Sequence, residues 1–335
     1  MIRNVFHRWE RRLAAAAENR TVRPFEWGID WIPELRPIGG EEASLLREWA
    51  AEAVERSDAY FAAAPAACTL HGDRLTYASA IVTPHAENNT VAARYFPDAS
   101  LRGRKRAVLV LPQWNADPEG HVGLCRLMNR FGISALRLSL PYHDSRMPPE
   151  LRRADYIVSA NIGRTLTVCR QAVLDARQAI AWLHEQGYES IGIMGTSLGS
   201  CLSMLTAAHE PLVKVAALNH ISPYFADVIW SGLSTVHVRE SLDGHVDIDS
   251  LREMWMPISP WPYIERLRRT RALLVYALYD LSFPLDLSRR LVQEFRARRV
   301  PHDVAVLPCG HYSTGLTPFK YLDGFTLCRF LSRHL

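Results

Sequence analysis

The sequence has few cysteines and almost no lysine. Six cysteines are scattered over 335 residues, with no C-x-x-C pair and no histidines at the spacing of a zinc site. This usage predicts buried free thiols in a reducing compartment rather than a disulfide framework. Lysine occurs only at positions 105, 214 and 320, so arginine carries nearly all of the positive charge, as in proteins encoded by GC-rich bacterial genomes.

Long hydrophobic runs and an excess of one charge are also absent. No stretch approaches the roughly 20 apolar residues of a membrane-spanning helix, and the first 20 residues carry charge throughout, unlike a signal peptide. The formal net charge is +4, which gives no electrostatic footprint for nucleic acid, and the phosphate-binding and dinucleotide motifs are missing. We therefore expect a cytoplasmic protein without a nucleic-acid partner, stable membrane insertion, metal or organic cofactor; the oligomeric state stays open.

The first 64 residues predict a helical N-terminal extension. Five apolar residues recur there at helical spacing, and a second periodic stretch covers residues 41–63. The five are Ile2, Val5, Phe6, Trp9 and Leu13. Arginines beside this stripe make a membrane-surface or partner helix an alternative, but we favour docking on the chain's own domain because such stripes usually bury intramolecularly.

Residues 65–335 show the pattern of one α/β domain. Short, partly alternating segments between residues 67 and 97 predict antiparallel strands. Six near-continuous apolar runs follow, most of them separated by helical patterns, at residues 107–113, 133–140, 190–195, 215–220, 272–280 and 303–311. Strands buried on both faces and alternating with helices predict a mostly parallel sheet covered by helices on both faces.

Residues 221–270 interrupt this rhythm without a convincing strand. An interval of this length is unusual for a plain connection. It is rich in aromatic residues, including Tyr224, Phe225, Trp230, Trp255 and Trp261. We therefore expect a helical insert that forms a cap over a cleft.

The segment with the clearest chemistry is Gly195-Thr196-Ser197-Leu198-Gly199, which directly follows the apolar run 190–195 and opens a helical pattern. A serine becomes a useful nucleophile when it is held out of the sheet near a base and amide donors. A sharp strand-to-helix turn does this, and its crowding requires small neighbours such as these two glycines. The pattern G-x-S-x-G is weak by itself, but between a buried strand and a helix it is much stronger.

With this motif the chain resembles the α/β-hydrolase superfamily over roughly residues 65–335. The resemblance implies a nucleophile, an acid and a base in that order, the last two after strands: Ser197, then Asp280 at the end of run 272–280, then His311 at the end of run 303–311. Taken singly, Asp280 reads equally well as a helix cap and His311 as a buried, hydrogen-bonded histidine. Their joint order favours a catalytic triad. The substitutes are His220, Asp286 and His302, and each lies less well at a strand end.

The resemblance also implies an oxyanion hole with two donors. The first is the backbone N–H of Leu198. The second should follow run 107–113, where the superfamily often has His-Gly and this chain has Pro112-Gln113-Trp114-Asn115. We assign it to the N–H of Trp114, with Gln113 as the alternative; Trp114 could also pack in an acyl pocket.

Further residues are candidates for substrate binding. Tyr142 and His143 follow run 133–140 at the edge of the sheet where α/β proteins bind ligands, although a satisfied loop histidine is the commoner reading. From the insert we select Trp230, Trp255 and Trp261. The segment His245–Asp249 lacks the glycine and distal carboxylate of a calcium loop, so no metal site is predicted.

These features predict a serine hydrolase that cleaves a small carboxylic ester through an acyl-enzyme on Ser197. The Pro-Tyr pair after run 133–140 and the surroundings of Ser197 resemble the group called abhydrolase-domain-containing protein eighteen. An acyltransferase that uses the same acyl-enzyme is the alternative, since the composition does not show whether water is excluded. A non-catalytic binding protein on the same fold is a third reading.

Overall fold

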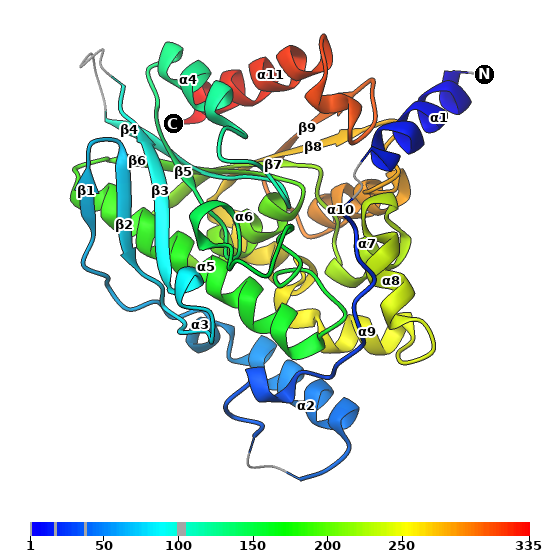
Figure 1. Cartoon of the computed structure of the whole chain (residues 1–335). Helices are drawn as coiled ribbons and strands as arrows, with labels where there is room; N and C mark the ends of the chain where they lie inside the picture. Colours follow the sequence, from blue (N-terminus) through cyan, green and yellow to red (C-terminus); the bar gives the residue numbers. More distant parts are fainter. Residues whose placement is uncertain (1, 17–18, 37–38, 99–104) are drawn as a thin grey trace.

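The computed structural model describes residues 2–16, 19–36, 39–98 and 105–335; residues 1, 17, 18, 37 and 38 of the predicted extension lie outside this description. Its centre is one nine-stranded sheet in the order β1-β2-β3-β5-β4-β6-β7-β8-β9 (Figure 1). The strands are β1 (Thr69–His71), β2 (Arg74–Ala78), β3 (Thr90–Phe96), β4 (Arg106–Leu111), β5 (Ser134–Leu138), β6 (Ser190–Thr196), β7 (Val213–Asn219), β8 (Arg271–Ala277) and β9 (His302–Leu307).

The pairing of the strands confirms the predicted fold class. β2 is antiparallel to both of its neighbours, β1 and β3, and β3 is antiparallel to β5. From β5 to β9 every neighbouring pair is parallel. Each of the six apolar runs overlaps one of these parallel strands. Of the antiparallel strands predicted between residues 67 and 97, β2 ends at Ala78. Its continuation leaves the sheet at Ser79, whose hydroxyl donates to the Asp175 carboxylate.

Helices cover both faces of the sheet. α4 (Val122–Arg130) and α11 (Phe319–His334) lie on one face, and α5 (Ile162–Glu185), α6 (Leu198–His209) and α10 (Leu285–Ala297) lie on the other (Figure 1). Side chains of β4 alternate between the two faces of the sheet: Val108 and Val110 pack in the core under α4 and α11, and Leu109 packs in the core under α5 and α6. The near-continuous apolar run is therefore the expected sequence of a strand buried twice.

The interval between β7 and β8 is helical, as expected. It contains α7 (Phe225–Ser231), α8 (Val236–Leu242), α9 (Ile248–Met254) and the 3-10 turns Leu233–Thr235, Met256–Ile258 and Trp261–Arg269. α9 packs against α2 (Glu42–Glu55) of the N-terminal region, which also holds the short α3 (Ser57–Tyr60). The division into an extension, a catalytic domain and a cap stays a prediction.

The first helix, α1 (Ile2–Ala15), packs on the chain's own fold. The Phe6 ring stacks on Tyr279 with centroids 4.4 Å apart. Only part of the predicted stripe is used, because Ile2 and Val5 are exposed. None of the helices in the described part of the chain is long and apolar enough to cross a membrane. All six cysteines are free, and five of them are buried.

A buried ion pair fixes the loop that follows β5. The Arg146 guanidinium is fully buried and donates to the Asp175 carboxylate of α5 at 2.8 Å. Its other donors reach the backbone oxygens of Ser139 and Asn88. The pair therefore joins the loop after β5 to α5 and to the segment before β3.

We predict that Arg146→Ala lowers the free energy of unfolding by about 3–5 kcal/mol, because it leaves the Asp175 carboxylate buried without its cation. Arg74→Ala is the control: Arg74 is exposed and reaches the same loop only through a 3.4 Å contact to Ser145, so its loss should cost below about 1 kcal/mol. Urea unfolding measures both, and equal losses would contradict the structural role of the pair.

Candidate active site

Ser197 lies at a sharp turn between β6 and α6. Its backbone has φ 58° and ψ −121°, a region that non-glycine residues rarely adopt and that costs free energy. The Ser197 N–H donates to the carbonyl of Asn219 at the end of β7. The structure thus holds the serine at the carboxyl edge of the sheet, in the strand-turn-helix context that the motif predicts.

Two glycines make this turn possible. A Cβ on Gly195 would lie 2.0 Å from the carbonyl oxygen of Gly199, and a Cβ on Gly199 would lie 2.1 Å from the carbonyl oxygen of Leu111. The second contact brings the end of β4 directly against the first turn of α6. The loop that contains Gln113 and Trp114 is therefore a close neighbour of the serine.

The predicted oxyanion donors are free of protein acceptors. Across the described ranges, no backbone or side-chain oxygen accepts the N–H of Leu198, Gln113 or Trp114. The N-terminus of α6 adds a partial positive charge at the same place. That these N–H groups form an oxyanion hole stays a prediction.

His143 supports this loop from behind and does not line the cleft. Its buried ring donates from Nδ1 to the Pro141 carbonyl at 2.9 Å and accepts the Asn115 N–H on Nε2 at 2.9 Å. Burial lowers the pKa of His143 to about 4, so the ring is neutral and Nε2 can accept. The indole Nε1 of Trp114 donates to the Ala154 carbonyl at 2.8 Å and fixes the other side of the loop.

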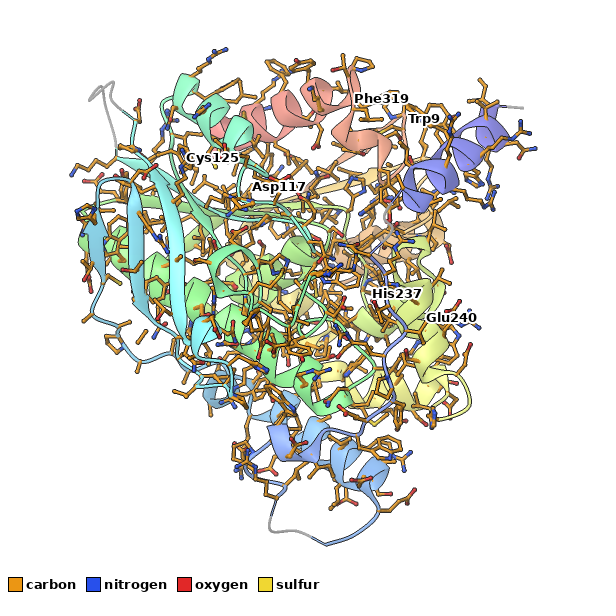
Figure 2. All side chains as sticks on the ribbon, in the orientation of Figure 1. Trp9, Asp117, Cys125, His237, Glu240 and Phe319 are labelled. Carbon is orange, nitrogen blue, oxygen red and sulfur yellow. The ribbon has the colours of Figure 1, made fainter. Side chains whose placement is uncertain are left out.

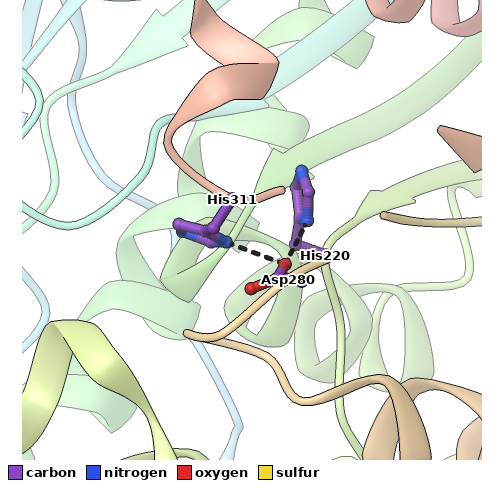
Figure 3. A group of neighbouring side chains, drawn as sticks. All are labelled: His220, Asp280 and His311. Atoms are coloured by element: carbon purple, nitrogen blue, oxygen red, sulfur yellow. Dashed lines mark hydrogen bonds and ion pairs between the residues drawn. The ribbon is translucent and has the colours of Figure 1, made fainter. Parts of the chain in front are cut away.

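Asp280 and His311 meet at the ends of the last two strands (Figure 3). The Nδ1 of His311 lies 3.1 Å from Oδ2 of Asp280, which leaves Nε2 of the ring for a reacting group. The other oxygen, Oδ1, accepts the backbone N–H groups of Ser282 and Phe283 at 2.8 and 2.7 Å. The Phe283 ring stacks on the His311 imidazole. Asp280 therefore orients this imidazole as a triad acid would.

A second imidazole shares the same carboxylate. The Nδ1 of His220 lies 2.8 Å from Oδ2 of Asp280, and its ring centroid lies 4.8 Å from that of His311 (Figure 3). The sequence placed His220 at the end of run 215–220 but offered it only as a substitute base. No motif indicates that two histidines would share one carboxylate, because the contact joins residues 60 positions apart.

These contacts set the charges of the pair. Burial acts to raise the pKa of Asp280, but the imidazoles of His311 and His220 outweigh it and hold the pKa below its usual range. Burial acts to lower the pKa of His311, yet the Asp280 carboxylate prevails and raises it above 6.5. Asp280 is thus ionised at neutral pH, and His311 has an increased affinity for a proton.

The same three side chains are the cluster that could hold a metal ion. Their ligand atoms lie within 4.8 Å of one another. The two Nδ1–Oδ2 distances, 2.8 and 3.1 Å, are those of hydrogen bonds. Ligands placed about 2.0 Å from a tetrahedral zinc ion would lie about 3.3 Å apart. The geometry therefore favours two imidazoles that share hydrogen bonds with one carboxylate oxygen.

Ser197 lies between two hollows. The smaller is lined mostly by apolar side chains and has a volume of about 40 Å³. Its lining is Trp114, Val158, Ser197, Leu198, Cys201, Ser222, Tyr224, Phe225, Val228, Ile229, Ser234, Thr235 and Phe283. The larger is a cleft of about 1030 Å³ that also contains His220 and His311. The serine and the proposed base thus face one cleft; in the described structure no hydrogen bond joins them.

The other predicted substrate residues lie away from both hollows. Tyr142 and Trp255 are fully buried; the Tyr142 hydroxyl meets His85, and the Trp255 indole donates to the Ile162 carbonyl. Trp230 lies under the Arg239 guanidinium, and Trp261 stacks on Tyr224. These aromatic rings stabilise the insert and its neighbours. The residues of the insert that do reach Ser197 are mainly those at its start, such as Phe225 and Ile229.

Neither a family model nor a curated protein sequence matches the chain. Solved structures do. Acylaminoacyl peptidase from Pyrococcus horikoshii superposes with a TM-score of 0.59 at 14% identity, over 81% of this chain and 42% of that one. Acetyl xylan esterase 1 from a Thermoanaerobacterium species superposes with a TM-score of 0.58 at 14% identity, over 96% and 97% of the two chains. Est1E from Butyrivibrio proteoclasticus, solved with ferulic acid, gives 0.54 at 12% identity, over 73% and 95%.

The chain has the α/β-hydrolase fold. The match spans under half the length of the peptidase and nearly all of the acetyl xylan esterase. In this fold the nucleophile turn lies between a central strand and its helix, where β6 and α6 meet in this structure. The likeness concerns the fold, and the roles of the residues rest on the geometry above.

We predict that Gly199→Ala lowers the free energy of unfolding by about 1–3 kcal/mol or more, because its Cβ would overlap the Leu111 carbonyl. Gly123→Ala is a matched control at the second position of α4, where an added Cβ meets nothing within 4 Å. This control should be neutral or stabilising by up to about 1 kcal/mol. Thermal unfolding of both variants tests the close approach of β4, and an undisturbed Gly199→Ala protein would refute it.

Proposed function

We propose that the protein is a serine hydrolase that cleaves carboxylic esters through an acyl-enzyme on Ser197. The observation that carries this proposal is the position of Ser197 on a strained strand-to-helix turn, facing the same cleft as an imidazole that Asp280 orients. The fold is shared with esterases and a peptidase, which supports hydrolysis in general.

The proposed reaction uses only groups of this chain, the ester and water. As Oγ of Ser197 attacks the ester carbonyl carbon, Nε2 of His311 takes its proton, and Asp280 stabilises the imidazolium. The N–H groups of Leu198 and Trp114, or Gln113, bind the oxyanion. The tetrahedral intermediate expels the alcohol, which leaves with the proton from His311. A water molecule then attacks the acyl-enzyme while His311 takes its proton. The bond to Oγ of Ser197 breaks, the carboxylic acid leaves, and His311 returns the proton to Ser197. His311 has to approach the hydroxyl for the first step, as is common when substrate is absent.

The two hollows suggest how an ester would lie. The apolar hollow, with a volume of about 40 Å³, has room for a short acyl group but not for a long one. The cleft is far larger, and cationic side chains line it, including Arg20, Arg153 and Lys320. We therefore propose a short acyl group beside Leu198 and a larger polar alcohol in the cleft.

Two alternatives use the same fold. An acyltransferase would pass the acyl group to another alcohol or amine, and product analysis with added acceptors separates it from a hydrolase. A non-catalytic binding protein would leave Ser197 unreactive towards a fluorophosphonate. The kinship with abhydrolase-domain-containing protein eighteen and a cytoplasmic location are proposals that rest on the sequence.

We predict that nitrophenyl acetate and butyrate are hydrolysed much faster than the palmitate, because the small hollow excludes long chains. Ser197→Ala should lower kcat about 10⁴-fold or more, since it removes the nucleophile. Ser145→Ala, at an exposed serine, is the control and should retain wild-type rates. Equal rates for the wild type and Ser197→Ala would refute the function, whereas a preference for palmitate would refute only the acyl-group assignment.

We predict that kcat/KM rises with pH through a midpoint above 6.5, because the base must be deprotonated and Asp280 raises the pKa of His311. Asp280→Asn should move this midpoint to lower pH and cut kcat about 10⁴-fold. EDTA should leave the wild-type rate unchanged. Loss of activity in EDTA with recovery on adding zinc would instead assign His220, Asp280 and His311 to a metal site.

A further inference from the structure

Glu10 of α1 is a fully buried carboxylate outside the proposed triad. Its exposed fraction is 0%, although it lies on an otherwise charged and largely exposed helix. Oε2 accepts the backbone N–H of Tyr312 at 2.8 Å, and Oε1 accepts that of Ser313 at 3.0 Å. One carboxylate therefore holds the two residues that directly follow His311.

The loop before His311 is shaped around the same carboxylate. A Cβ on Gly310 would lie 2.3 Å from Cδ of Glu10, so a larger residue there would displace the Glu10 carboxylate. The Gly310 N–H donates to Oγ of Ser313, and its carbonyl accepts the hydroxyl of Thr314. Glu10 thus closes one side of a loop that is hydrogen-bonded to itself on the other.

Aromatic contacts fix α1 at this place. Phe6 stacks on Tyr279, the residue before Asp280, at 4.4 Å. Trp9 lies beside Phe319 at the start of α11, with centroids 6.5 Å apart (Figure 2). α1 therefore contacts the loops of both the proposed acid and the proposed base.

A buried carboxylate is costly unless hydrogen bonds compensate it, and both described side-chain hydrogen bonds of Glu10 go to the base loop. We propose that Glu10 is a positioning residue that holds the His311 loop in its working geometry, which makes α1 a part of the active site. This inference rests on the proposed role of His311 as the base.

The charge of Glu10 gives the proposal a distinctive readout. The titratable groups around His311 are Asp280, His220, Glu10 and Tyr312, with Arg20 on the Tyr312 hydroxyl and Asp323 of α11 near His220. Against burial, both Asp280 and Glu10 act to raise the pKa of His311. Removing the Glu10 charge must therefore lower it.

The test compares Glu10→Gln and Glu10→Ala with Glu48→Gln, a charge-matched control at an exposed position of α2. Rates are divided by the number of active sites that react with a fluorophosphonate, which separates a slower reaction from a loss of folded enzyme. We expect Glu10→Gln to lower kcat about 10-fold and Glu10→Ala about 100-fold, with KM within 2-fold, because misplacing a catalytic group costs about this much. The midpoint of the acid limb should move to lower pH in both, and Glu48→Gln should match the wild type.

Unchanged kcat and pH midpoint in Glu10→Gln would overturn the proposal, as would a loss of titratable sites with wild-type kcat per site. If both Glu10 variants fail to fold, Phe6→Ala loosens α1 instead, and it must lower kcat for the proposal to stand. NMR titration of the His311 ring follows its pKa without substrate. If the wild type hydrolyses no ester but the pKa of His311 is lower in Glu10→Gln than in the wild type, the contact is upheld and only the proposed function is rejected.

Discussion

The buried carboxylate of Asp280 is the group on which the arrangement of the site depends. An ionised carboxylate is stable inside a protein only when donors surround it, and Asp280 has four: two backbone N–H groups and two imidazoles. Those donors come from the segments after β7, β8 and β9. Satisfying one charge therefore fixes the relative positions of three loops, including that of the proposed base.

Much of this frame could be predicted from the sequence because its causes are local or periodic. A strand buried on both faces must be apolar nearly throughout, so each parallel strand corresponds to an apolar run in the sequence. The turn at Ser197 requires glycines at fixed offsets, which any chain with this geometry must show. The resemblance to the α/β-hydrolase superfamily supplied the order of nucleophile, acid and base, and the ends of two runs pointed to Asp280 and His311. The structure places these two side chains in contact.

The side chains around the frame could not be predicted, because their neighbours come from distant parts of the chain. Aromatic composition indicated a cap but not the direction of each ring: Trp255 lies in the core, while Phe225 lines the apolar hollow beside Ser197. His143 was a candidate for the cleft, with a hydrogen-bonded loop histidine as the commoner reading, and its ring accepts the Asn115 N–H. The one signal of Glu10 in the sequence is a carboxylate within an apolar stripe, but nothing in the sequence connects Glu10 with residues 312 and 313.

The contact between Glu10 and Tyr312 spans 302 positions of the chain. At a translation rate of about 5–20 residues per second, the carboxylate is synthesised roughly 15–60 s before its partners. During that interval the turn that carries Ser197 is synthesised, while the loop that carries the proposed base does not yet exist. Final assembly of the candidate site is therefore a late, long-range event, and a nascent chain that ends before residue 311 lacks the proposed base.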